Sequence, residues 1–139
     1  MEFNVSEPTV LHLSGNTSIT GVDEKNPIVF NGPLMFVQDG GSISLRNVEF
    51  RNGQSYNVDG RNWSGAVNIL NAKAKIENVK SFNAQAEDAI NFVSSQTTGT
   101  RLEIYSAQSD GIDVDFGIFS FGKVLCNVIG NDCFDTSGV

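Results

Sequence analysis

The feature that most constrains the fold of this chain is a short motif that returns about every 22 residues. Its four copies read SGAVNIL, EDAINF, SDGIDVDF and NDCFDTSG, and they begin at Ser64, Glu87, Ser109 and Asn131. The apolar residues at their centres are spaced by 23, 22 and 22 residues and are Val67, Ile90, Ile112 and Phe134. A fixed period of this length is typical of a solenoid, in which each repeat packs only on its neighbours.

The segments between the copies repeat as well, apart from one insertion. LRNVEF at 45–50 resembles IENVKSF at 76–82, yet Asn47 and Asn78 are 31 residues apart, which exceeds the period. The excess falls on residues 51–63, RNGQSYNVDGRNW, whose Gly, Asn and Asp content is typical of a loop. We therefore expect a loop inserted into one coil.

Alternation within the repeats favours strands over helices. Ile112, Val114 and Phe116 alternate with Asp113 and Asp115, and no segment sustains the apolar spacing of three and four residues that a helix needs. Leucine-rich repeats share the period, but their leucine ladder is missing. Short strands with one buried face, stacked coil on coil, predict an all-β fold, a right-handed parallel β-helix (a solenoid) of about five coils of 22–23 residues.

The whole chain, residues 1–139, is expected to form a single β-helix domain. Residues 1–41 repeat least well and predict irregular N-terminal coils or a cap, whereas 42–139 predict regular coils with the loop at 51–63. Each end of a β-helix exposes an unpaired strand edge. We therefore expect a homo-oligomer, a homodimer through an open end or edge, or else a fragment of a longer protein.

The succession of motifs from W-x-G-A-V-N at Trp63 to N-D-C-F-D-T-S-G at Asn131 resembles a known module. It is similar, over about residues 42–138, to the right-handed β-helix found in some bacterial proteins beside a spore-coat-protein-H-type kinase domain. The wider superfamily is the pectate-lyase-like (pectin lyase-like) β-helices. The resemblance implies the fold and a bacterial source but no activity, because the kinase part is absent from this chain. Family members usually continue past the D-x-S-G motif, whereas this chain ends at Val139.

The aspartates of the motif have a structural interpretation. Alternation directs Asp113 and Asp115 outward, and the period predicts an outer file of stacked residues. The members of that file are Asn68, Asn91, Asp113 and Asp135. A second column precedes the strands and is expected to line a turn, where carboxylates accept backbone N–H groups. Its members are Asp88, Asp110 and Asp132.

A bound cation is the first alternative. Like charges on adjacent strands repel each other, so Asp113 beside Asp135 needs compensation. A Ca²⁺ ion takes six to eight oxygen ligands and would supply it. The candidate metal ligands are Asp110, Asp113, Asp132 and Asp135. The nonapeptide of calcium-binding β-rolls is missing, and no other cofactor is expected.

Catalysis is the second alternative. Asp113, Asp115 and Asp135 could act as acid and base on a polysaccharide. Against this, the acidic positions follow the structural period, and the Asn-Thr-Asp, Asp-Asp and Gly-His-Gly elements of polygalacturonases are missing. The single histidine, His12, lies far away in sequence and is expected on an exposed strand face.

The inserted loop offers a candidate ligand-binding surface. It contains Arg51, Tyr56, Arg61 and Trp63, and inserted loops of repeat proteins often lie on the binding face. The alternative is that Trp63 covers the coil edge as a lid. The full candidate ligand-binding set adds outward residues of the file and reads Arg51, Tyr56, Arg61, Trp63, Asn91, Asp113 and Asp115.

Charge narrows the range of partners. The net charge is −7, and residues 84–139 carry eight acids against Arg101 and Lys123. Such a chain should repel nucleic acid and anionic membranes, so neither is expected as a partner, whereas cations and basic proteins are.

The two cysteines, Cys126 and Cys133, are expected to be free thiols. Free thiols and the lack of a signal peptide predict a cytoplasmic protein, or an extracellular one if the chain is part of a longer secreted parent. Together these patterns predict a non-catalytic β-helical binding or assembly module with a glycan, cation or protein ligand. The alternative is a polysaccharide-active enzyme (a hydrolase or lyase), or its degenerate remnant.

Overall fold

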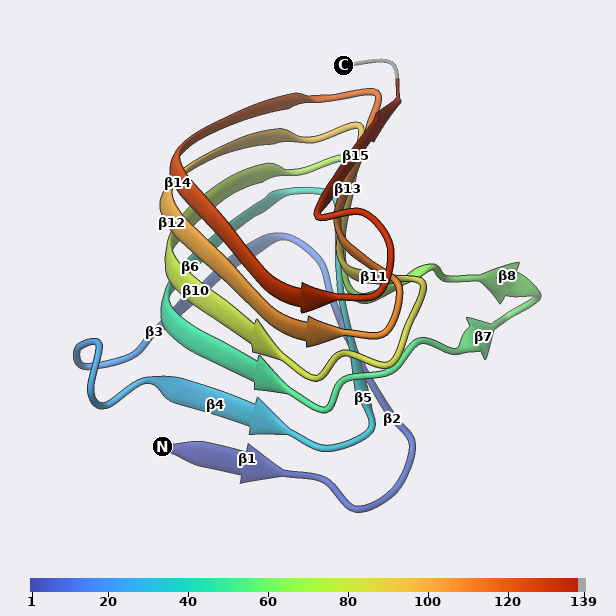
Figure 1. Cartoon of the computed structure of the whole chain (residues 1–139), viewed down its shortest axis with the longest axis horizontal. Coiled ribbons are helices and arrows are strands. Elements are labelled where there is room, and N and C mark those ends of the chain that lie inside the picture. Colours follow the sequence, from blue (N-terminus) through green and yellow to red (C-terminus); the bar gives the residue numbers. More distant parts are fainter. Residues whose placement is uncertain (138–139) are drawn as a thin grey trace.

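The computed structural model describes residues 1–137 and winds into a parallel β-helix of about six turns (Figure 1). Two parallel sheets form its walls. Sheet A contains β1 (Glu2–Asn4), β3 (Asn16–Thr20), β4 (Ile28–Asn31), β6 (Ser42–Arg51), β10 (Lys73–Phe82), β12 (Gln96–Ala107) and β14 (Ile118–Ile129). Sheet B contains β2 (Thr9–Leu13), β5 (Leu34–Asp39), β9 (Gly65–Leu70), β11 (Asp88–Val93), β13 (Asp110–Asp115) and β15 (Phe134–Ser137). The predicted all-β, right-handed parallel β-helix is confirmed.

The register between coils follows the period of the sequence. Val67, Ile90, Ile112 and Phe134 are successive partners across β9, β11, β13 and β15. The first three side chains are buried between the two sheets, and Phe134 in the last coil is 41% exposed. The repeat therefore positions one residue of each coil directly over the same residue of the previous coil.

Asparagines form the corners where sheet A ends and the chain turns toward sheet B. Asn52 and Asn83 have φ values of 60° and 54°, a left-handed conformation that Asn tolerates better than most residues. The Asn83 side chain donates to Asn52 Oδ1 at 2.7 Å, and that of Asn52 donates to Asn31 Oδ1 at 2.8 Å. Each amide is both donor and acceptor, so the corner residues link consecutive coils.

The N-terminal segment joins the same two sheets through shorter strands. In the later coils a single long strand crosses sheet A, but β3 and β4 divide that path, and they pair with the first and second halves of β6. Residues 21–27 separate the two strands. Among residues 1–137, no helix is long and apolar enough to cross a membrane.

The insertion at 51–63 contains an antiparallel hairpin of β7 (Asn57–Val58) and β8 (Arg61–Asn62), which projects from the coils in Figure 1. Its turn residues Asp59 and Gly60 both have positive φ, as two-residue hairpins favour. Tyr56, Val58 and Trp63 pack on the outer face of sheet B, against the otherwise exposed Met35, Val37 and Leu70. Because of this cover, apolar residues on both faces of β5 and β9 are buried.

The expectation of free thiols is wrong, because Cys126 and Cys133 form a disulfide with their Cα atoms 5.8 Å apart. Cys126 pairs in register with Ile104, whose side chain is fully buried, so Cys126 also packs against the core. The Cys133 carbonyl accepts a hydrogen bond from the Ile112 N–H at 2.9 Å. A side chain at the neighbouring Gly111 would place its Cβ 2.7 Å from that carbonyl oxygen and 3.3 Å from the Cys126 sulfur, so this position beside the disulfide favours glycine. Because both cysteines are in the disulfide, they give no support to the expectation of a reducing compartment.

The corner asparagines give a prediction on stability. We expect Asn52→Ala to lower the free energy of unfolding by about 2 kcal/mol, because it removes two side-chain hydrogen bonds and places a Cβ-bearing residue without a polar side chain at positive φ. Asn52→Gly loses the same hydrogen bonds, but glycine adopts positive φ without strain, so the free energy of unfolding should fall by less. Urea unfolding measures both variants, and equal losses would contradict the role given to the left-handed corner.

Candidate functional site

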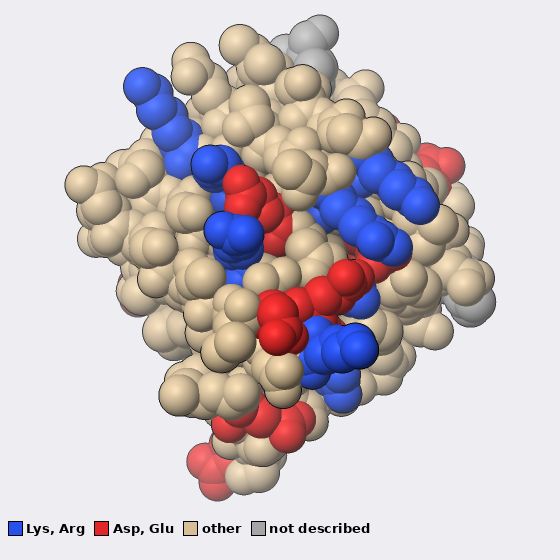
Figure 2. All heavy atoms as spheres, turned by 90° about the vertical axis from the view of Figure 1, so that its left-hand side faces the viewer, with Lys and Arg blue, Asp and Glu red and all other residues tan. Residues whose placement is uncertain are grey.

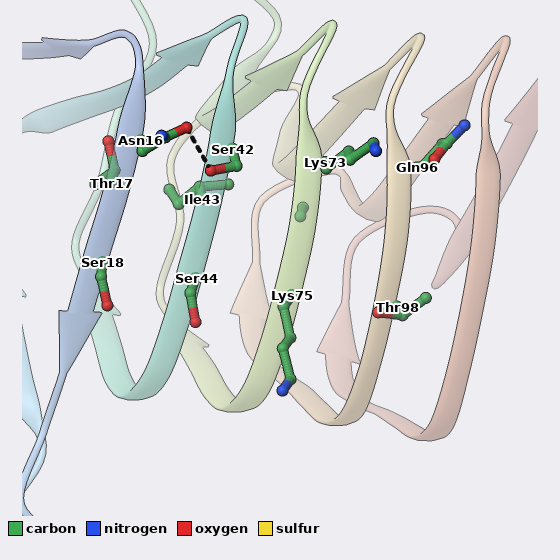
Figure 3. A pocket seen from close by; sticks show the side chains of 11 residues that line it. Asn16, Thr17, Ser18, Ser42, Ile43, Ser44, Lys73, Lys75, Gln96 and Thr98 are labelled. Carbon is green, nitrogen blue, oxygen red and sulfur yellow. Dashed lines mark hydrogen bonds between the residues drawn. The ribbon is translucent and has the colours of Figure 1, made fainter.

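Outward-facing residues of sheet A form polar columns that cross the coils. In the first column each residue is the register partner of the next, and its members are Asn16, Ser42, Lys73 and Gln96. The second column lies two residues further along each strand, and its members are Ser18, Ser44, Lys75 and Thr98. Figure 3 shows these side chains on four neighbouring strands, with the Ser42 hydroxyl donating to Asn16 Oδ1 at 2.9 Å.

The two columns line an open groove of about 550 Å³. Its lining includes hydroxyl, amide and ammonium groups, but none of its residues is an Asp, Glu or His. Lys75 Nζ lies 3.3 Å from Glu77 at the edge of the groove, whereas Lys73 forms no ion pair with any residue of 1–137. The groove is therefore locally cationic although the chain as a whole is acidic.

Beside the groove, sheet A carries a network of ion pairs. Arg101 Nη2 lies 2.8 Å from Glu103 Oε1, and Lys80 Nζ lies 3.7 Å from Glu103 Oε2. Burial opposes ionisation of Glu103, but the hydrogen bond and charge of Arg101, aided by Lys80, lower its pKa. Glu103 is thus held as a carboxylate, and its negative charge offsets the positive charges of Arg101 and Lys80.

The two sheets differ sharply in charge. Seven of the nine Lys and Arg residues of the chain lie in strands of sheet A, namely Arg46, Arg51, Lys73, Lys75, Lys80, Arg101 and Lys123. Figure 2 shows basic side chains spread over this side of the molecule with acidic ones between them. The described strands of sheet B contain no Lys or Arg and six aspartates: Asp39, Asp88, Asp110, Asp113, Asp115 and Asp135.

The predicted outer file on sheet B has the register that the period implies. Asn68, Asn91, Asp113 and Asp135 are successive partners. The Asn91 amide donates to the Ser64 hydroxyl at 2.9 Å, and the Asn68 side chain donates to Gly65 O and accepts from Gly65 N. The asparagines bond locally, whereas Asp113 and Asp135 are left as neighbouring carboxyls.

Two carboxyls of this face have strongly raised pKa values. Burial raises the pKa of Asp88, which is 2% exposed, to about 7; a hydrogen bond from Ser64 lowers it in part, and the charge of Asp113 adds to the increase. Burial also raises the pKa of Asp113 to about 6, with further contributions from Asp115 and Asp135. Asp88 Oδ2 and Asn91 Oδ1 are buried without a hydrogen-bond partner among the described residues.

The predicted turn column behaves as expected at Asp110. Its Oδ1 accepts from the Asp132 backbone N–H at 3.0 Å and from the Asn131 side chain at 2.9 Å, so the carboxylate fastens the next coil. Within residues 1–137, no three His, Cys, Asp or Glu side chains are arranged to hold a metal ion. The proposed ligand quartet of Asp110, Asp113, Asp132 and Asp135 is thus not gathered into one cluster, and Ca²⁺ binding stays a prediction.

The candidate residues of the inserted loop occupy separate places. Arg51 ends β6 on sheet A, where its Nη2 lies 2.6 Å from Glu49 Oε1. Tyr56 donates its hydroxyl to Pro33 O at 2.6 Å, and the Arg61 guanidinium lies over the Trp63 ring, 4.0 Å from its centroid. Asn91, Asp113 and Asp115 belong to later coils of sheet B, so the predicted ligand-binding set is not one site. His12 is exposed on β2, as expected, with Nε2 3.8 Å from Asp39 Oδ2.

The groove on sheet A was missed from the sequence, although a signal for it exists. The stretches SIS at 42–44, KAK at 73–75 and QTT at 96–98 begin with the register partners Ser42, Lys73 and Gln96. Their alignment by the repeat, with allowance for the inserted loop, indicates a polar face on this sheet.

Comparison with protein-family models, curated proteins and solved structures finds no match to this chain. Of the resemblance to pectate-lyase-like modules, the parallel β-helix is confirmed by the coordinates.

The buried Asp88 carboxyl predicts a pH dependence of stability. Its folded pKa of about 7 lies above the ordinary value of 3.8, so the native state binds more protons than the unfolded chain between these values, and stability falls as pH rises through that window. We expect Asp88→Asn to stabilise the protein at pH 8 by up to about 4 kcal/mol relative to its effect near pH 4. Asp59→Asn, at an exposed position in the hairpin turn, is the matched control. An unchanged pH slope in Asp88→Asn urea unfolding would refute this assignment.

Proposed function

We propose that this protein is a non-catalytic binding module that holds an extended acidic polysaccharide along the groove on the outer face of sheet A. The observation that supports this most is the groove of about 550 Å³ with hydroxyl, amide and ammonium groups in register across four coils. It is larger than the pocket beneath the hairpin, which has a volume of about 230 Å³.

The regular spacing of the polar groups favours a polymer over a compact ligand. Successive members of a column are separated by one strand spacing, about 4.8 Å, so similar donors and acceptors recur along the coil axis. Extended surfaces of this kind are what repeat proteins use to bind long ligands. Hydroxyls such as Ser44 and Thr98, and the amide of Gln96, suit a ligand that is itself rich in hydroxyl groups.

Local charge favours an acidic polymer. Lys73 and Lys75 are the charged residues of the lining, and Lys73 has no carboxylate partner within residues 1–137. A flexible ammonium with three donors can follow carboxylates that are not rigidly placed. The positive electrostatic potential of Lys73 and Lys75 attracts the acidic ligand to this face, although the net charge of −7 opposes its approach from other directions.

Binding without turnover is favoured because the groups suited to proton transfer lie elsewhere. The groove lining has no Asp, Glu, His or Cys, whereas the carboxyls with raised pKa belong to sheet B. The resemblance to pectate-lyase-like β-helices also supports a glycan ligand. Association with a spore-coat-protein-H-type kinase in a bacterium is part of the proposal, and a neighbouring coding sequence for such a kinase would support it. Homodimerisation is a further prediction that sedimentation would test.

The groove predicts that charge, and two lysines in particular, control affinity. We expect polygalacturonate to bind and a neutral glucan to bind more weakly, with Lys73→Gln and Lys75→Gln each weakening polygalacturonate about two- to fivefold, as exposed ion pairs do. Affinity should also fall with added salt. Isothermal titration calorimetry measures these constants.

Lys123→Gln is the matched control for these variants, since it removes a charge from β14 outside the groove lining. Equal affinity for the acidic and neutral polymers, or a loss in Lys123→Gln as large as in Lys73→Gln, would refute the groove as the binding face.

A second candidate function is a polysaccharide-active enzyme that uses the carboxyls of sheet B. The observation in its favour is that the pKa of Asp88 and of Asp113 lies near 7 and 6, where general acids operate. Asp88 is buried, so Asp113 and its neighbours Asp115 and Asp135 would have to contact the substrate. Turnover of any member of an acidic and neutral glycan panel that Asp113→Asn or Asp115→Asn abolishes would establish this function in place of simple binding.

A further inference from the structure

A second, smaller pocket lies between the inserted hairpin and the outer face of sheet B. Its volume is about 230 Å³, and it is bordered by β2, β5 and the hairpin. Val10, which is 39% exposed, and Val58 provide its accessible apolar lining, and Trp63 provides an aromatic wall. The fully buried Met35 and Val37 pack behind Val58 and Trp63. This pocket is distinct from the groove on sheet A, with which it shares no residue.

Two of the four polar residues of the pocket are acidic. Asp39 comes from β5 and Asp59 from the hairpin turn, and the lining contains a single Arg or Lys, Arg61. His12 lies 3.8 Å from the Asp39 carboxylate, and its ring meets that of Trp63 edge-on at 6.3 Å between centroids. Asp39, Asp59 and Arg61 together give the lining a formal charge of −1.

The Trp63 ring is already used as a platform for a cation. The Arg61 guanidinium lies 4.0 Å from its centroid, within the range at which the ring quadrupole attracts positive charge. Arg61 begins β8 (Arg61–Asn62), and Trp63 directly follows that strand, so the chain itself places a cation on this ring. An external cation in the pocket would meet the same ring together with two carboxylates.

We propose that the pocket beneath the hairpin binds a small organic ammonium ion with an apolar body. The carboxylates of Asp39 and Asp59 and the indole of Trp63 attract the positive charge, while Val10 and Val58 contact the apolar part. A liquid water occupies about 30 Å³, so the space suits a molecule of about seven or eight non-hydrogen atoms. Choline has this size and this chemistry.

The experiment uses Trp63 as the reporter, because it is the only tryptophan of the chain. The intact protein is titrated with choline and with its uncharged isostere 3,3-dimethylbutan-1-ol, at constant ionic strength, and tryptophan fluorescence and calorimetry are both recorded. For a ligand of this size we expect saturable binding of choline with a dissociation constant of the order of 1 mM. The uncharged isostere should bind at least about threefold more weakly, because it lacks the ion–carboxylate and cation–π attraction.

Variants locate the site. Asp39→Asn and Asp59→Asn should each weaken choline about two- to fivefold, whereas Asp135→Asn, on the same sheet but outside the pocket, should leave it unchanged. The proposal is overturned if neither fluorescence nor calorimetry shows saturable choline binding, if the neutral isostere binds as well as choline, or if both pocket variants bind like the unaltered protein. Polygalacturonate binding through the groove would be unaffected by any of these results.

Discussion

The in-register hydrogen bonding of each coil to the next is the constraint on which the rest of this structure depends. Because the strands are parallel and the period is nearly constant, Val67, Ile90 and Ile112 occupy equivalent positions in successive coils. Because the register is parallel, residues at equivalent positions of successive coils stack on one another. Apolar residues therefore form a continuous core, and the corner asparagines form side-chain hydrogen bonds from coil to coil. A repeated motif therefore becomes a set of continuous columns, and the columns become the surfaces of the molecule.

The same register also has an energetic consequence, since it places like charges side by side where the motif carries an acid. On sheet B, Asp113 adjoins Asp135, and no Lys or Arg is available in the described strands to neutralise them. Burial and mutual repulsion consequently raise the pKa of Asp88 and Asp113. On sheet A the acids alternate with bases, and the network around Glu103 lowers the pKa of that carboxyl. One chain thus presents an acidic wall and a largely neutralised or cationic wall around one core.

Much of this architecture could be predicted from the sequence because the information is local and repeated. The period fixed the stacking of the outer file through Asn91 and Asp113, and the composition of residues 51–63 predicted the insertion. Contacts that occur only once in the chain could not be predicted from the repeat, because the repeat carries no information about them. The Cys126–Cys133 disulfide depends on two inward positions of the last coil, and the pocket of Trp63 depends on where the hairpin folds back. The groove was overlooked because serine and lysine columns lack the conspicuous charge of the aspartates.

The most direct test of the account is a map of the residues whose amide resonances shift when a short oligogalacturonate is added to the isotopically labelled protein. If coil register builds the binding face, three segments remote in sequence should respond together: Ser42–Ser44, Lys73–Lys75 and Gln96–Thr98. The strands β11 and β13 of sheet B should stay unchanged. Shifts confined to sheet B, or a response in only one of the three segments, would contradict the proposal that stacked columns on sheet A form the ligand site.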